Sequence, residues 1–113
     1  RRLVAAGGDD TVKGPLFDWL RGLDWPEGPW ALRTLRNATT DRWAADLPAL
    51  REALAGPQQA LAEARGRGDY DIAPVIAGEA ADLVRTREPA GAVVQRMVRE
   101  AAACLAAMRD IDH

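Results

Sequence analysis

Apolar residues recur most regularly in the last quarter of the chain. After Glu88-Pro89 they return every three or four positions, which is the spacing of one helix face. Arg96, Arg99 and Glu100 mark the other face. We therefore predict a long amphipathic helix that docks on another surface, because each large buried side chain contributes roughly 1.5–3 kcal/mol before entropy is subtracted. This apolar stripe, the Val93–Met108 stripe, consists of Val93, Val94, Met97, Val98, Ala101, Cys104, Leu105 and Met108.

Shorter apolar runs, divided by glycine and proline, precede that helix. Gly7-Gly8 is expected to end a helix in the left-handed conformation, Gly22 is expected to end a second, and Gly66-Arg67-Gly68 is expected to end a third. Since the first of these helices has no visible beginning, we expect the chain to belong to a longer protein. Thr39 or Thr40 is the expected N-cap of a helix through Trp43. The remaining short helices are expected over residues 16–21, 47–55, 57–64 and 78–84.

Two segments have extended character. Residues 9–13 form a short extended piece before Gly14-Pro15, and residues 31–37 suit either a short strand or a helical turn. The chain is therefore predicted to be mainly α: a small helical domain of short helices plus one long C-terminal helix, with at most one short strand pair. Its 113 residues fit one folded unit, made of segments 1–67 and 68–113.

Composition narrows the function classes. A net charge of −2 argues against a nucleic-acid partner, which would require a basic excess. No apolar run approaches the roughly 20 residues that span a bilayer. The single cysteine excludes an intramolecular disulfide and suits a reducing compartment, so we expect a cytoplasmic protein.

The residues that usually carry chemistry are scarce, so we assign no catalytic residue and no metal ligand. The only histidine, His113, is terminal, and a catalytic base must be held in place. Cys104 lies on the apolar helix face and is expected to be a small core residue. The acidic doublets are interpreted as solvated turn and cap residues. They are Asp9-Asp10, Asp69-x-Asp71 and Asp110-x-Asp112.

Four tryptophans are many for this length, and two of them bound the loop WPEGPW of residues 25–30. Such rings can form the small core of a loop-rich domain, or they can bind a ligand or partner. We favour the core interpretation and keep a small-molecule sensor as an alternative. The tryptophans are Trp19, Trp25, Trp30 and Trp43.

Several segments match one known pattern in order and spacing over nearly the whole chain. They resemble the C-terminal part of the nitronate monooxygenase family, also called 2-nitropropane dioxygenase-like. The segments are Asp10-Thr11-Val12, Phe17-Asp18, Arg21-Gly22-Leu23-x-Trp25-Pro26, Leu35-Arg36-Asn37, Thr40-x-x-Trp43, Gly68-Asp69, Val75-x-Ala77-Gly78-Glu79, Asp82-Leu83-Val84, Pro89-Ala90 and residues 94–101.

The resemblance implies a flavoprotein oxidoreductase that uses FMN to oxidise alkyl nitronates, or in relatives to reduce enoyl thioesters. Members combine a TIM barrel with a mainly helical substrate domain. It further implies that Ala77, Gly78 and Glu79 lie beside the FMN cofactor and that Tyr70 borders the substrate pocket. The last helix would pack on the outside of the barrel.

The chain departs from the family in two respects. Glu79 stands where the family usually has glutamine. The barrel is absent, since eight strands need roughly 250 residues, and the phosphate loops and catalytic histidine are absent with it. We therefore expect a C-terminal portion of a monooxygenase-like enzyme that is inactive alone. The alternative is a stand-alone helical module that binds a partner or forms a homodimer through the Val93–Met108 stripe.

Overall fold

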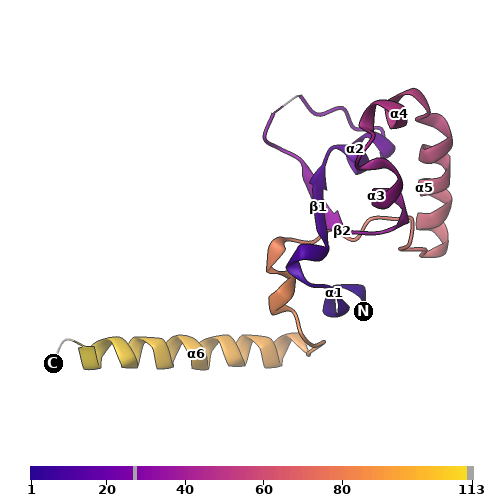
Figure 1. The fold of residues 1–113 in the computed structure, drawn as a ribbon. Coiled ribbons are helices and arrows are strands. Elements are labelled where there is room, and N and C mark those ends of the chain that lie inside the picture. Colours follow the sequence, from indigo (N-terminus) through magenta and orange to yellow (C-terminus); the bar gives the residue numbers. More distant parts are fainter. Residues whose placement is uncertain (27, 112–113) are drawn as a thin grey trace.

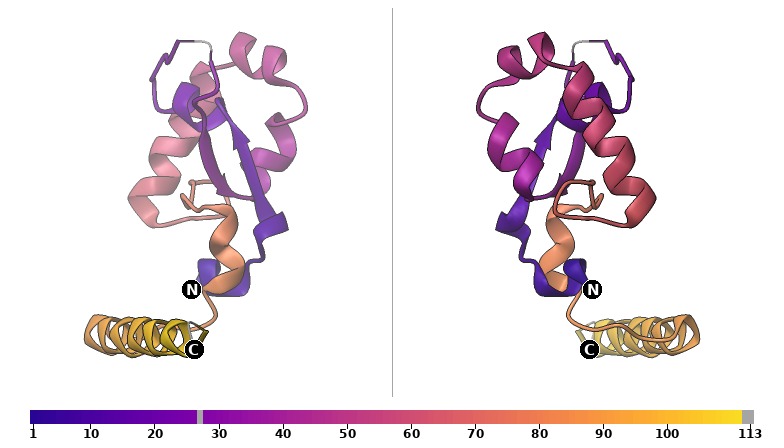
Figure 2. Two further views of the ribbon diagram at one scale, coloured as in Figure 1. Left: turned by 90° about the vertical axis from the view of Figure 1, so that its left-hand side faces the viewer. Right: turned by 90° about the vertical axis from the view of Figure 1, so that its right-hand side faces the viewer.

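The computed structural model describes residues 1–26 and 28–111, with the side chains of residues 1–26 and 28–109. The fold is mainly helical, as the sequence predicts, and the described residues contain one two-stranded sheet and no barrel. Residues 1–84 form a body, and one long helix projects from it (Figures 1 and 2). The elements are α1 (Arg2–Ala5), the 3₁₀ turn η1 (Gly8–Asp10), β1 (Thr11–Gly14), α2 (Leu16–Leu20), β2 (Leu32–Leu35), α3 (Ala38–Trp43), α4 (Leu47–Glu52), α5 (Ala55–Arg67), the 3₁₀ turn η2 (Glu79–Leu83) and α6 (Ala90–Ile111).

The sheet consists of β1 and β2, paired antiparallel with Thr11 opposite Leu35 and Gly14 opposite Leu32. This resolves residues 31–37 in favour of a strand. β2 has a second neighbour on its other edge, where an isolated antiparallel bridge joins Thr34 to Ile76. β2 therefore holds the N-terminal strand on one side and the later loop on the other.

The core lies between α2, α4 and α5. Apolar side chains of these helices meet at three- and four-residue spacings, and Leu50 of α4 at the centre is 0% exposed. Partly buried Trp19 and Trp43 pack against this cluster. The buried residues of the core cluster are Leu16, Phe17, Leu20, Leu50, Leu61, Ala64 and Ala73.

Two helix ends follow the sequence prediction and one does not. Gly22 and Gly68 have φ of 74° and 70°, the left-handed conformation that glycine adopts without steric cost after α2 and α5. The prediction of a left-handed stop at Gly7-Gly8 is wrong. Gly7 is extended, with φ of −96° and ψ of 172°, and α1 ends at Ala5.

Position 8 requires glycine because a side chain there would clash with η2. The Gly8 amide donates to Oδ1 of Asp82 at 2.6 Å, which brings η2 against η1. A Cβ on Gly8 would lie 2.7 Å from the Glu79 carbonyl oxygen and 2.7 Å from Oδ2 of Asp82. These contacts are too close, so a larger residue must push the two turns apart.

Gly8→Ala is accordingly expected to destabilise the body by about 1–3 kcal/mol, the usual range for overpacking. Chemical denaturation followed by circular dichroism measures this change. Gly14→Ala is the matched control, because a Cβ at Gly14 meets nothing within 4 Å. We expect it to shift the free energy of unfolding by less than about 0.5 kcal/mol. Equal effects of the two substitutions would contradict the crowding at Gly8.

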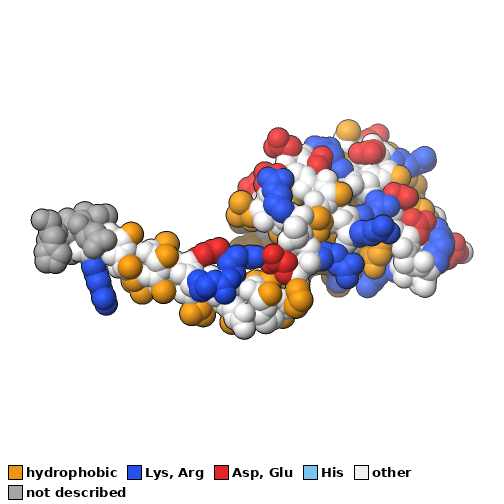
Figure 3. All heavy atoms as spheres, turned by 90° about the horizontal axis from the view of Figure 1, so that it is seen from below, with side chains coloured by type: hydrophobic (Ala, Val, Ile, Leu, Met, Phe, Trp, Pro, Cys, Tyr) orange, Lys and Arg blue, Asp and Glu red, His pale blue; other side chains and the backbone are white. Residues whose placement is uncertain are grey.

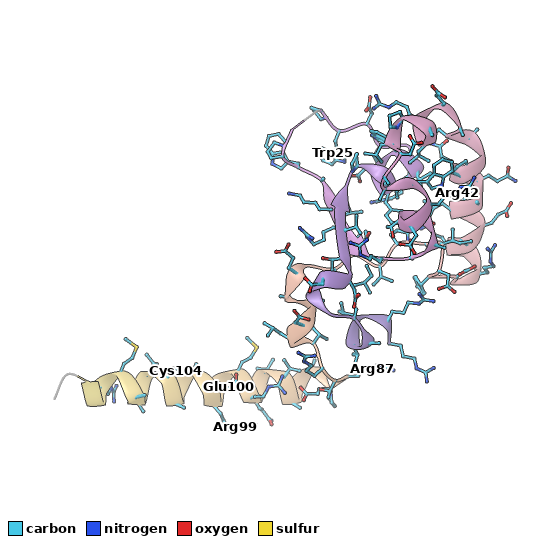
Figure 4. All side chains as sticks on the ribbon, in the orientation of Figure 1. Trp25, Arg42, Arg87, Arg99, Glu100 and Cys104 are labelled. Carbon is cyan, nitrogen blue, oxygen red and sulfur yellow. The ribbon has the colours of Figure 1, made fainter. Side chains whose placement is uncertain are left out.

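The tryptophans divide into two pairs. Trp19 and Trp43 contribute to the core, as predicted, and each lies under an arginine: Arg51 is 4.3 Å from the Trp19 ring centroid, and Arg42 is 4.7 Å from that of Trp43. Trp25 and Trp30 are 62% and 74% exposed, so the core prediction is wrong for them. Figure 4 shows Trp25 on the loop that joins α2 to β2. Residue 27 of this loop lies outside the described residues.

α6 begins directly after Glu88-Pro89, as predicted, and extends over 22 residues away from the body. Its start is tied by an ion pair between Arg96 and Glu88. The Glu88 carboxylate raises the pKa of the Arg96 guanidinium, mainly through this hydrogen bond and then through its charge. None of the helices in the described part of the chain combines the length and apolar composition that crossing a bilayer requires.

Candidate functional site

The candidate site lies on the segment between α5 and η2, which folds back along β2. The Leu35 amide donates to the Val75 carbonyl at 2.9 Å, and the Ala77 amide donates to the Arg33 carbonyl at 3.2 Å. Further along, the Ala38 amide donates to the Asp71 carbonyl at 2.9 Å. We call residues 69–79 the return segment. Backbone pairing with β2 fixes its position although it contains only an isolated bridge.

Asn37 clamps the return segment to the start of α3. Its Oδ1 accepts from the Thr40 amide at 3.1 Å, while the Thr40 hydroxyl accepts from the Asn37 amide at 2.9 Å, which completes a capping box. Its Nδ2 donates to the Ala73 carbonyl at 3.0 Å. Thr39 adds a bond from its hydroxyl to the Ile72 carbonyl at 2.8 Å. One buried amide side chain thus joins the start of α3 to the return segment.

The predicted N-cap at Thr39 or Thr40 is therefore wrong, because Asn37 occupies that position. Asparagine is among the strongest N-cap residues, since its short side chain reaches the amide three positions later. The signal was present in the sequence as Asn37 followed by a hydroxyl residue at Thr40. Its second function, holding the return segment, depends on tertiary contacts and leaves no local pattern.

The Ala77-Gly78-Glu79 turn lies at the far end of the return segment, where Gly78 precedes η2. Gly78 has an ordinary φ of −88°, and a Cβ there would meet only the Ala80 amide nitrogen, at 3.9 Å. Neither the backbone conformation nor the packing of this chain requires glycine at this position. The turn is therefore open enough for a ligand to approach its backbone closely.

Glu79 forms an ion pair with Arg33 of β2, with Oε1 3.0 Å from Nη2. The same guanidinium donates from Nη1 to the Thr11 hydroxyl at 3.0 Å. Arg33 thus links β1, β2 and the turn. The Glu79 side chain is 74% exposed, so this pair contributes at most about 1 kcal/mol. Glutamate at this position has an internal partner, which sequence reasoning missed because Arg33 lies 46 positions earlier (79 − 33).

Tyr70 lies at the opposite end of the return segment and is half exposed. It borders a hollow of about 260 Å³ together with Arg2, Asp10, Arg36 and Asn37. Arg2 is engaged with Asp71, 2.7 Å away. A hollow of this size is below the roughly 300–1,000 Å³ of typical small-molecule pockets, so it is too small to hold a cofactor such as FMN by itself.

The structure therefore brings Ala77, Gly78 and Glu79 together at one turn and places Tyr70 in a separate hollow. Within the described residues, no three His, Cys, Asp or Glu side chains come close enough to hold a metal ion. His113 and the side chains of the Asp110-x-Asp112 doublet lie outside the described residues. The arrangement offers backbone, one phenol and arginine–carboxylate pairs, which can position a ligand but include no imidazole or thiol base.

The Val93–Met108 stripe is exposed in the structure, apart from Val93, which is half-buried. The predicted core role of Cys104 is wrong within this chain, because its side chain is exposed on a helix that has left the body (Figure 4). Figure 3 shows hydrophobic side chains along much of α6 with no other element over them. The largest exposed members, each between 59% and 64% accessible, are Val94, Met97, Val98, Leu105 and Met108.

No family model, curated protein or solved structure gives a significant match to this chain.

Proposed function

We propose that this chain is the C-terminal portion of an FMN-dependent, nitronate monooxygenase-like oxidoreductase and that it is inactive without a flavin-binding barrel. The observation that carries the proposal is the uncovered Val93–Met108 stripe. A 22-residue helix with apolar side chains about 60% exposed gains further stability when another surface covers it. The outer face of a barrel is such a surface.

The contacts inside the body support the proposal. Segments of the motif set that are far apart in sequence meet around β2: the Arg36 amide donates to the Asp10 carbonyl at 2.7 Å, and the Leu35 amide donates to the Val75 carbonyl at 2.9 Å. Asn37, which also belongs to the motif set, holds the return segment through its bond to the Ala73 carbonyl. The motif residues thus build one rigid frame that ends at the Ala77-Gly78-Glu79 turn.

In the proposed enzyme this turn lies beside the flavin. Gly78 leaves room for a ring system to approach the backbone, and Ala77 and Glu79 flank it. Tyr70 lies on the substrate side, where its hydroxyl can donate a hydrogen bond to an anionic substrate such as a nitronate. FMN supplies the redox chemistry when bound. The phosphate-binding loops and the catalytic histidine belong to the barrel.

The purified chain is expected to retain no flavin: after mixing with FMN and desalting, it should be colourless at 450 nm. The matching observation is the coding sequence before Arg1, where we expect an open reading frame for a glycine-rich FMN barrel. The product of the whole frame should bind FMN and oxidise an alkyl nitronate. A yellow chain with a shifted flavin band would disprove the need for a barrel, and a frame without a barrel would disprove the assignment.

The same stripe favours a second candidate, a stand-alone module that dimerises through α6. Size-exclusion chromatography with light scattering separates the two. A monodisperse dimer that dissociates when Met97 and Leu105 are replaced by glutamine would establish the module. A monomer whose aggregation increases with concentration would support the first candidate, that the chain is a portion of a larger enzyme.

A further inference from the structure

A large hollow outside the candidate site is lined by aromatic rings. It has a volume of about 830 Å³, and its lining residues come from α2, from the loop between α2 and β2, and from α4. This volume is within the roughly 300–1,000 Å³ range of small-molecule pockets. The side chains that define its chemistry are Asp18, Trp19, Asp24, Trp25, Trp30 and Arg51.

Three of the lining residues are tryptophans, and two of these rings have no packing partner that buries them. Trp25 and Trp30 are 62% and 74% exposed, which is a large apolar area to leave in water. The Trp30 ring is not free of contacts, because it lies against the loop backbone at Gly28, where a Cβ would meet ring carbons at 2.9 Å. Glycine at position 28 thus allows the ring to lie close to the loop and border the hollow.

The acidic side chain of Asp18 also lines the hollow, and it is only 11% exposed. Among the described residues its one charged partner is Arg21, at 4.0 Å, and no hydrogen bond to its carboxylate is present. Its oxygens stay accessible to solvent, since no side-chain oxygen among the described residues is fully buried without a hydrogen-bond partner. A cation that entered the hollow would compensate this charge. Asp24 on the loop adds a second negative charge at the rim.

We propose that this hollow binds a small organic ammonium ion. Tryptophan faces attract a desolvated cation through their quadrupole, and quaternary ammonium groups are bound in cages of such rings. Here Trp25 and Trp30 supply the free faces and Asp18 supplies the counter-charge. This site is independent of the proposed flavoenzyme assignment, since none of its lining residues belongs to the return segment.

Arg51, which also lines the hollow, shows that one of its tryptophan rings already binds a cation. Its guanidinium lies 4.3 Å from the centroid of the Trp19 ring, so this ring already accepts a cation in the structure. A ligand cation must therefore use Trp25 and Trp30, and it is repelled by Arg51 at the rim. Removal of this positive charge should strengthen the binding of a cation and weaken the binding of an anion.

The test uses three ligands of one shape and different charge: choline, its carbon isostere 3,3-dimethylbutan-1-ol, and 3,3-dimethylbutyrate. Isothermal titration calorimetry with the full chain measures each affinity. We expect choline to bind at least about ten-fold more tightly than the neutral isostere. Equal affinity for choline and the alcohol would show that the hollow is only an apolar pocket and would overturn the proposal. A preference for the carboxylate would also overturn it.

Variants locate the binding. Trp25→Ala and Trp30→Ala change exposed rings, so both variants should fold, and each should weaken choline binding at least about five-fold. Trp43→Phe, on the core side, is the control and should leave it unchanged. Arg51→Gln should strengthen binding. Asp18→Asn should weaken choline binding, and its melting curve shows whether the variant folds. Asp24→Asn removes the second negative charge and should also weaken choline binding. Wild-type affinity in both exposed tryptophan variants would overturn the proposal.

Discussion

Leu50→Ala is expected to lower the free energy of unfolding by about 2–5 kcal/mol, the largest effect that we expect from a single substitution in this chain. Leu50 is 0% exposed at the centre of the core, where α4 meets α2 and α5. Truncation removes three carbon atoms from a packed site and leaves a cavity, because helices anchored on both sides cannot fully collapse into it. Since small domains are stable by only about 5–15 kcal/mol, the variant is expected to approach global unfolding.

Chemical denaturation followed by tryptophan fluorescence measures the change, because Trp19 and Trp43 pack against the cluster that Leu50 belongs to. Leu105→Ala is the matched control: the same atoms are removed from a side chain that is 63% exposed on α6. It should cost less than about 0.5 kcal/mol in the isolated chain. A large loss from Leu105→Ala would show that α6 is covered in solution, by the body or by a second copy.

Asn37→Ala is expected to cost about 2–4 kcal/mol, the second-largest effect. It removes the cap of α3, worth typically about 1 kcal/mol, and leaves the Ala73 carbonyl without its donor, which costs about 1–3 kcal/mol when buried. Loss of this bond should also release the return segment from β2. Faster amide hydrogen exchange at residues 73–77 is the specific signature, measured by mass spectrometry or NMR.

Two variants separate the cap from the clamp. Asn37→Ser keeps a capping hydroxyl but cannot reach Ala73, so it should recover about 1 kcal/mol of the loss and none of the protection at residues 73–77. Asp46→Ala removes only a cap, that of α4, where Oδ1 accepts from the Ala49 amide at 3.2 Å. If Asn37→Ala costs no more than Asp46→Ala, Asn37 is a helix cap and nothing else.

Local signals in the sequence are sufficient for the helices and several of their ends. The three- and four-residue spacing of apolar positions predicts α6, and glycine at positions 22 and 68 marks left-handed stops that the structure contains. These features depend on neighbouring residues only. The fold class follows from them, because a chain of this length with such helices has few residues left for strands.

Long-range contacts cannot be predicted in the same way. Periodicity shows which face of a helix is apolar but not whether its partner belongs to the same chain, so the core prediction for Cys104 is wrong. The exposed rings of Trp25 and Trp30 follow the same rule: composition indicates apolar area, and only tertiary geometry decides whether it is buried. At the candidate site, the roles of Arg33 and Asn37 as partners depend on the position of the return segment along β2, which no local pattern encodes.

The isolation of α6 has a consequence for any binding event that involves it. Helices of about 12–15 residues or fewer are marginal in water, and one of 22 residues that projects from the body owes much of its order to its own turns and the Arg96–Glu88 pair. In solution its outer turns should fray and re-form. A barrel or a second copy would therefore meet an ensemble, and association would complete the helix as it covers it. Part of the interaction energy would then be consumed by ordering, which makes the partnership weaker and more readily reversed than its apolar area suggests.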